Sequence, residues 1–91
     1  MTAADLIIMI KSNLSIAGNT WDNYLATLIE ASRQMIAREG ITLGDTMEDA
    51  NLIVMYTAYL FRKRAEDNPA MPRMLRYALN NRLLSEKGAV S

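Results

Sequence analysis

Apolar residues recur along the chain every three or four positions, in four stretches that are separated by loop-forming residues. This spacing is typical of α-helices that bury one face. The first stretch begins near Thr2, which has with Asp5 the spacing of a helix capping box. It runs to about Asn13, and the glycine-containing residues 15–19 are predicted to form a loop.

A second helix is predicted from residues 19–20 to Gly40, because glycine suits the left-handed conformation that often ends a helix. The third helix is expected to start at Asp45 and Glu48, which again have the spacing of a capping box. It should continue to about residues 65–66.

The fourth helix follows a break at Asn68-Pro69, since proline disfavours the helical conformation in the residue before it. Pro72 suits the first position of this helix, where a missing N–H costs nothing. The helix should end at residues 87–88, and residues 88–91 are expected to be a frayed tail. With no strand-like alternation, the sequence predicts an all-α fold: one domain over residues 1–91, a compact bundle of about four helices.

The first and third helices are more apolar than a small monomer requires. Residues 6–10 are five consecutive large apolar residues, which cover more than a full helical turn, and residues 52–61 contain Thr57 as their one polar residue. We expect the third helix to be the central one, wrapped by the others. The terminal first helix has only one side to bury, so we expect it to contact another chain through Leu6, Ile7, Met9 and Ile10.

The chemical groups of most enzymes are missing. The chain has no histidine and no cysteine, so the commonest general base, thiol nucleophiles, disulfides and the common zinc sites are excluded. It also lacks the glycine-rich phosphate loops and the calcium-loop spacing. The sequence therefore predicts a non-enzymatic protein with no cofactor and no metal.

Nothing along the chain predicts insertion into a membrane or secretion. No run reaches the roughly 18 apolar residues of a membrane helix, and the first residues lack the positive charges of a secretory signal. We expect a protein that stays in the cytoplasm unless it leaves inside a larger particle.

The net charge is zero but unevenly divided. Residues 1–61 carry three basic and seven acidic side chains, or −4, and residues 62–91 carry seven basic and three acidic ones, or +4. This division fits a polyanion-binding end, or one end of a subunit that meets the opposite end of its neighbour. An ordinary solvated surface is the third interpretation.

The cations of residues 62–64 also have two interpretations. They can contact DNA phosphates together with Arg73 and Arg76, or they can offset the negative end of the third helix. The second interpretation is preferred, because only Tyr77 accompanies the later arginines and no aromatic platform for stacking bases is evident. Trp21 is interpreted as a core or interface anchor.

Two segments carry a resemblance to a known family. Residues 56–66 (YTAYLFRKRAE) and 71–82 (MPRMLRYALNNR) resemble the C-terminal half of small head–tail connector proteins of tailed bacteriophages and prophages, sometimes labelled head-completion or DNA-packaging proteins. The N-terminal part is similar in kind, with a helix that opens at Trp21-Asp22 and leads to Gly40-Ile41.

The resemblance implies a structural virion protein that is assembled in the cytoplasm of the bacterial host and located at the head–tail junction. Connectors of this kind form a homo-oligomeric ring of about a dozen copies below the portal protein. The ring extends the channel through which DNA passes non-specifically, and it docks the tail or the next head-completion protein. The length of this chain leaves little material for the docking loop or arm that some members carry.

In such a ring, unlike faces of neighbouring subunits meet, and the divided charge and the apolar first helix would supply them. We therefore add Arg62, Arg64 and Arg73 to the four apolar interface residues of the first helix, and we expect Lys63 and Arg76 to lie near DNA. The alternative function is a small helical nucleic-acid-binding or regulatory module that uses the basic residues of the C-terminal part: Arg62, Lys63, Arg64, Arg73 and Arg76.

Overall fold

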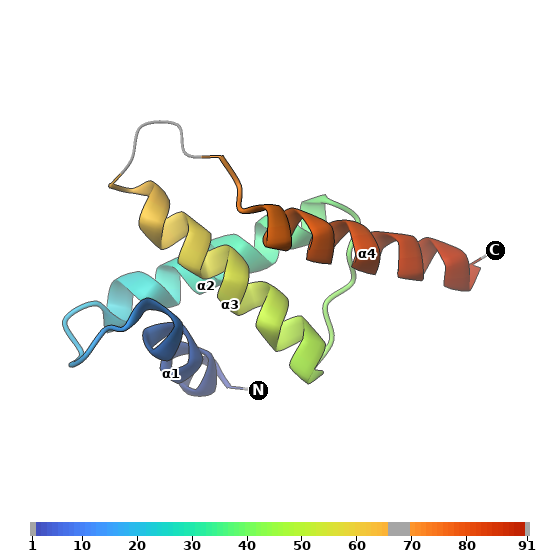
Figure 1. The fold of residues 1–91 in the computed structure, drawn as a ribbon. Coiled ribbons are helices and arrows are strands. Elements are labelled where there is room, and N and C mark those ends of the chain that lie inside the picture. The colour runs from blue at the N-terminus through green and yellow to red at the C-terminus, as the bar shows by residue number, and fades with distance from the viewer. Residues whose placement is uncertain (1, 66–69, 91) are drawn as a thin grey trace.

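The computed structural model describes residues 2–65 and 70–90, except for the side chains of residues 87–90. It contains four helices, in the order α1 (Ala3–Leu14), α2 (Asp22–Arg38), α3 (Met47–Lys63) and α4 (Arg73–Val90) (Figure 1). The described residues contain no strand. The predicted all-α bundle of about four helices is therefore confirmed.

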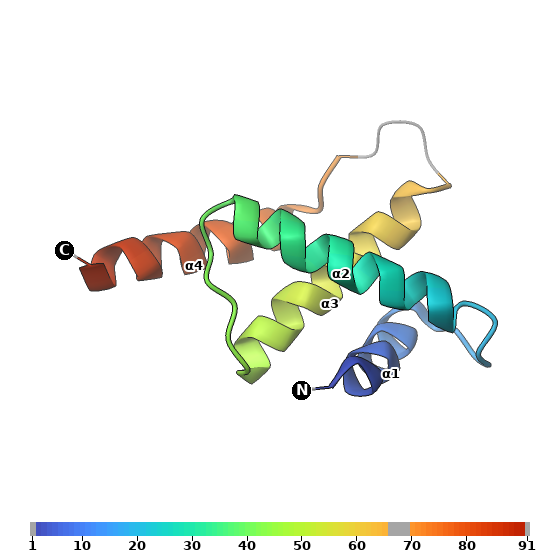
Figure 2. The same ribbon diagram turned by 180° about the vertical axis from the view of Figure 1, so that it is seen from behind.

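Helix α3 is the central element. Each of the other three helices packs against it, and Figure 2 shows α2 crossing it on the side opposite to that seen in Figure 1. This position explains why α3 is apolar on most of its surface, as the sequence predicted. Its buried residues are Asp49, Ala50, Leu52, Ile53, Val54, Tyr56, Thr57, Ala58 and Phe61.

Helices α1, α2 and α3 pack together as a three-helix body around one apolar core. Leu6 and Ile10 enter it from α1, and Leu25, Ile29 and Ile36 enter it from α2. The core also contains one polar contact, a 2.8 Å hydrogen bond between the hydroxyls of Ser32 and Thr57.

Helix α4 packs beside α3 through Leu75 and Leu79, which are both buried. Its later turns extend past the rest of the molecule, toward the C-terminal end marked in Figure 1. The molecule is correspondingly elongated, with principal extents of 46 × 31 × 18 Å.

Local hydrogen bonds set the helix ends, and they confirm two predicted signals. Thr2 and Asp5 form the expected capping box at the start of α1. Helix α2 begins at Asp22 instead of residues 19–20, and it ends at Arg38, followed by Gly40 with a φ of 97°. A residue with a side chain would be strained in this left-handed conformation.

The start of α3 differs from the prediction. Its cap is Thr46, whose hydroxyl accepts a hydrogen bond from the backbone N–H of Asp49 at 3.1 Å, so the predicted box of Asp45 and Glu48 is wrong. A threonine hydroxyl at this spacing satisfies an N–H that has no partner within the helix. The helix also ends earlier than predicted, at Lys63.

Helix α4 begins one residue after Pro72, whose carbonyl accepts the first helical hydrogen bond, from Arg76. It continues to Val90, so the predicted end at residues 87–88 and the frayed tail are wrong for residues 88–90. Ser91 and the predicted break at Asn68-Pro69 lie outside the described residues.

Candidate interaction surfaces

Helix α1 exposes a different residue from those that the sequence assigned to an interface. Leu6 and Ile10 are buried in the chain's own core and offer no surface to a partner, which corrects their assignment. Ile7 and Met9 are half-buried, whereas Ile8 is 67% exposed. Residues two positions apart lie about 200° apart around a helix. Because Leu6 and Ile10 point into the core, Ile8 points away from it. Helix geometry places Ile8 opposite Leu6 and Ile10 from the sequence alone, but it does not say which of the two sides is buried.

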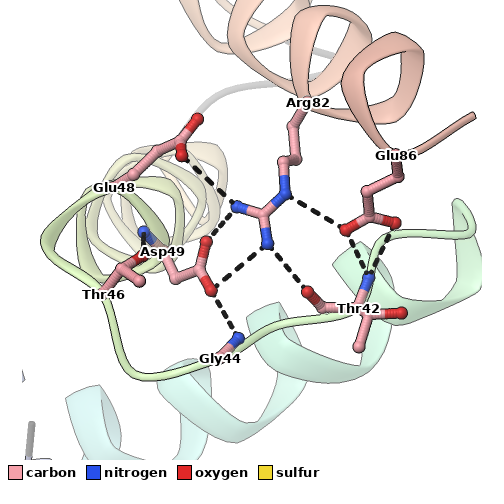
Figure 3. Close-up of polar contacts among 7 residues, drawn as sticks. All are labelled: Thr42, Gly44, Thr46, Glu48, Asp49, Arg82 and Glu86. Carbon is pink, nitrogen blue, oxygen red and sulfur yellow. Dashed lines mark hydrogen bonds and ion pairs between the residues drawn. The ribbon is translucent and has the colours of Figure 1, made fainter. Parts of the chain in front are cut away.

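A polar cluster around Arg82 fixes α4 to the start of α3 (Figure 3). The Arg82 guanidinium donates hydrogen bonds to both carboxylate oxygens of Asp49 and to the carbonyl oxygen of Thr42, the latter at 2.9 Å. It also pairs with Glu86 at 3.1 Å and with Glu48 at 3.7 Å. One side chain of α4 thus contacts both α3 and the loop between α2 and α3.

The carboxylate of Asp49 is the buried centre of this cluster, with an exposed side-chain fraction of 1%, against 16% for Arg82. It also accepts a hydrogen bond from the backbone N–H of Gly44. The hydrogen bond from Arg82 holds the pKa of Asp49 below its usual value, although burial opposes this shift. Asp49 in turn raises the pKa of Arg82. Both side chains are therefore charged at neutral pH.

A second arginine of α4 is paired in a similar way. Arg76 donates two hydrogen bonds to the carboxylate of Glu39, at 2.8 and 3.0 Å. Glu39 raises the pKa of Arg76. The sequence placed Arg76 near DNA, but here its guanidinium is held by a carboxylate of the same chain. The −4/+4 charge division is accordingly in part neutralised within the chain.

The cations at the end of α3 have no such partners. Arg62 donates a long hydrogen bond of 3.4 Å to Asn13, and the Lys63 ammonium lies 5.9 Å from the ring centre of Tyr59. Within residues 2–65 and 70–90, no carboxylate forms an ion pair with Arg62, Lys63 or Arg64, nor with the exposed Arg73. The end of α3 therefore carries a group of cations that no described carboxylate pairs with.

An aromatic cluster lies beside these cations. The ring of Trp21 packs edge-on against Phe61 with 5.3 Å between the ring centres, and Tyr24 lies 5.9 Å from Trp21. The guanidinium of Arg64 sits over Trp21 and Phe61, at 4.6 and 4.2 Å from their centres. Trp21 and Tyr24 remain more than a third exposed. The sequence did not predict Trp21 and Tyr24 next to these cations, because both come from the start of α2, far from residues 62–64 along the chain.

Two hollows follow one another along α3, and together we call them the α3 groove. The larger, of about 500 Å³, lies between α1 and α3, and the smaller, of about 160 Å³, reaches the start of α4. Asn13 lines both, so the two hollows adjoin at this residue. The larger hollow is lined by Ile8, Met9, Ser12, Asn13, Asn51 and Val54. The smaller is lined by Asn13, Met55, Ala58, Arg62, Pro72, Met74 and Leu75.

The outward side of α4 carries an apolar row that we call the α4 stripe: Met74, Tyr77, Asn81 and Leu84. Met74, Tyr77 and Leu84 are 76%, 58% and 68% exposed. None of these four residues was among those that the sequence assigned to an interface. The helical spacing of Met74, Tyr77, Asn81 and Leu84 is the sequence pattern that could have predicted this stripe.

Comparisons of the chain with protein-family models, with curated proteins and with solved structures find no match. The resemblance to head–tail connectors therefore stays a prediction. No helix within the described ranges combines the length and the apolar character that crossing a bilayer requires.

Proposed function

We propose that this chain is a structural subunit of a phage head–tail connector. In this proposal about a dozen copies form a ring below the portal protein, extend the DNA channel, and dock the tail or the next head-completion protein. The chain performs no chemistry of its own. Its function lies in its surfaces.

The observation that carries the proposal is the amount of apolar surface that one copy leaves uncovered. Ile8, Met74 and Leu84 are each more than two-thirds exposed. Leaving such a side chain in water forgoes roughly 1.5–3 kcal/mol relative to burying it. That cost is a large share of the roughly 5–15 kcal/mol by which small domains are stable, so a partner surface is expected.

The location of this surface also supports the proposal. The two segments that resemble connectors, residues 56–66 and 71–82, cover the second half of α3 and the first half of α4. These helices contribute to both the α3 groove and the α4 stripe. Since Arg76 and Arg82 pair within the chain, we expect subunit contacts to be mainly apolar.

The test is deletion of the gene in a lysogen or phage that carries it. A connector subunit predicts DNA-filled heads without tails in electron micrographs, and recovery of infectious particles when the gene is supplied in trans. The chain should also be detected by mass spectrometry in purified wild-type virions, in a copy number close to that of the portal protein. Tailed, infectious particles after deletion would rule the function out.

A nucleic-acid-binding module is the second candidate, and a specific observation favours it. Arg62, Lys63, Arg64 and Arg73 have no carboxylate partner among the described residues. Trp21, which is 36% exposed, lies beside Arg64, and aromatic rings among cations are a common platform for unpaired bases.

Titration with single-stranded and duplex DNA at low salt tests this candidate. Trp21 is the one tryptophan of the chain, so its fluorescence should be quenched when a base stacks on it. Reversal of charge at Arg62 and Lys63 should abolish binding, whereas reversal at the exposed Arg38 of α2 should leave most of it. Unchanged fluorescence and mobility at low salt would remove this candidate.

A further inference from the structure

The chain exposes more surface than a compact monomer of its mass. Its solvent-accessible area is 5911 Å² at 10.2 kDa. A compact monomer of that mass exposes roughly 5,300 Å². The difference of about 600 Å² approaches the roughly 800 Å² that one partner contributes to a standard protein interface. The exposed apolar side chains Ile8, Met74 and Leu84 belong to this surface.

The α3 groove has the chemistry of a site for a helix. Its walls are mainly apolar, from Ile8 and Met9 of α1 to Met74 of α4. Its polar lining residues are uncharged except for Arg62 at one end. A groove of this kind favours the apolar face of an amphipathic helix over a charged segment.

The α4 stripe is such a face. Its residues follow one another at intervals of three, four and three positions, which are the a and d positions of a heptad pattern. At about 100° per residue they stay within roughly 80° of the helix circumference. They include no charged residue, and Asn81 is the one amide among them.

The groove and the stripe also match in length. From Asn51 to Arg62 the groove follows α3 for about 16 Å, and from Met74 to Leu84 the stripe measures about 15 Å at 1.5 Å per residue. Each offers amides near its middle, Asn13 in the groove and Asn81 in the stripe, and two amides can hydrogen-bond to one another.

One chain cannot join its own stripe to its own groove. Met74 belongs to both, so α4 already forms a wall of the groove, and the rest of the stripe points away from the body. We propose that the α4 stripe of one copy lies in the α3 groove of a second copy. This contact rests on the proposed function in one respect: it is the subunit contact that the ring would use. Because it joins unlike surfaces, it leaves a free groove and a free stripe for further copies.

Disulfide trapping tests the contact directly, because the chain has no native cysteine. Asn13→Cys and Asn81→Cys proteins, each carrying one exposed thiol near the middle of its surface, are mixed under a glutathione redox buffer. Disulfides form only when the two Cβ atoms come within roughly 4.5 Å. We expect the mixed Asn13–Asn81 dimer to exceed either symmetric dimer. A Gln34→Cys protein, with its thiol on the exposed side of α2, is the control and should not pair with Asn81→Cys.

Polar substitutions give a second readout that does not depend on thiol geometry. Ile8→Ser and Leu84→Ser should each weaken self-association in sedimentation experiments by about tenfold or more, since each removes a large apolar contact. Met47→Ser is the matched control, because Met47 is 59% exposed but lines neither hollow. Circular dichroism should show unchanged helix content in all three variants.

The contact is contradicted if Asn81→Cys pairs as readily with itself or with Gln34→Cys as with Asn13→Cys, or if Met47→Ser weakens association as much as Leu84→Ser. These results are independent of the virion experiment. Tailed particles after gene deletion would end the connector function and leave a trapped Asn13–Asn81 dimer standing. Tailless heads without such a dimer would keep the function and exclude this contact.

Discussion

In the three-helix body, the buried contacts between helices are mostly apolar, with the ion pair of Lys11 and Asp22 joining α1 to α2, whereas α4 adds two arginine clusters to its two buried leucines. Ser32 and Thr57 form a single polar pair inside the body. On α4, Arg76 binds the carboxylate of Glu39, directly after α2, and Arg82 binds that of Asp49 in α3. Apolar burial is non-directional, while a bidentate arginine pair fixes both distance and orientation. Charged contacts therefore set the position of α4, and its outward stripe stays available.

The largest effect should come from the core of the body. Ile10→Ala should lower the free energy of unfolding by about 4 kcal/mol, because it removes a fully buried side chain and leaves a cavity. Ile8→Ala in the same helix should change it by less than about 0.5 kcal/mol in the monomer. Urea denaturation of both variants at low protein concentration measures the difference. Equal losses would mean that α1 is not packed as described.

The α4 cluster should give the next largest effect. Asp49→Ala leaves Arg82 without its main buried partner and should cost about 3 kcal/mol in urea denaturation. Glu48→Ala is the matched control, a carboxylate that is 71% exposed and 3.7 Å from the same guanidinium, and should cost less than about 1 kcal/mol. Combining Asp49→Ala with Arg82→Met should recover much of the loss. A double variant no more stable than Asp49→Ala would mean that the loss does not come from an Arg82 charge left without its most buried partner.

As the pH falls, α4 should lose its contacts with the rest of the chain before the three-helix body unfolds. Because the pKa of Asp49 lies below its usual value, this carboxylate contributes stability above the ordinary aspartate range near pH 4, and the contribution is lost as the pH falls through that range and below. The pKa of Asp5 is also lowered, by its hydrogen bonds to Thr2. Asp5 therefore also contributes stability that is lost as the pH falls. Hydrogen exchange at decreasing pH should show α4 amides losing protection first. Asp49→Asn should remove most of that difference, and simultaneous loss in α1 and α4 would contradict it.

The smallest effect is expected at the more exposed pair of α4. Glu39→Gln removes the carboxylate that binds Arg76, whose side chain is 40% exposed, and should cost about 0.5–1 kcal/mol. Its effect should shrink further at high salt, unlike that of Asp49→Ala. Thermal unfolding at low and high salt measures both. A loss as large as that of Asp49→Ala would mean that the two arginines contribute equally.

Much of the fold could be predicted from the sequence, because helix periodicity and end signals are local. The four helices, the central place of α3 and the cap at Thr2 all follow from residues a few positions apart. The errors are of the same local kind. Thr46 caps α3 where Asp45 was expected, since these two neighbouring polar residues can each serve as a cap and tertiary contacts decide between them.

The surfaces were predicted less well, because they depend on which residues meet across the fold. Asp49 looked like an ordinary acidic residue at a helix start, and its role depends on Arg82, 33 positions later. Leu6 and Ile10 were placed in an interface because five apolar residues in a row do not reveal which side faces the core. The stripe on α4 was missed because a buried face with Leu75 and Leu79 already explained the helix.

Sedimentation velocity of the unmodified chain over a series of concentrations shows whether its uncovered apolar surfaces bind another copy. We expect species heavier than 10.2 kDa that increase with concentration and persist at high salt, because the contact is apolar. A single species of 10.2 kDa at every concentration would contradict it.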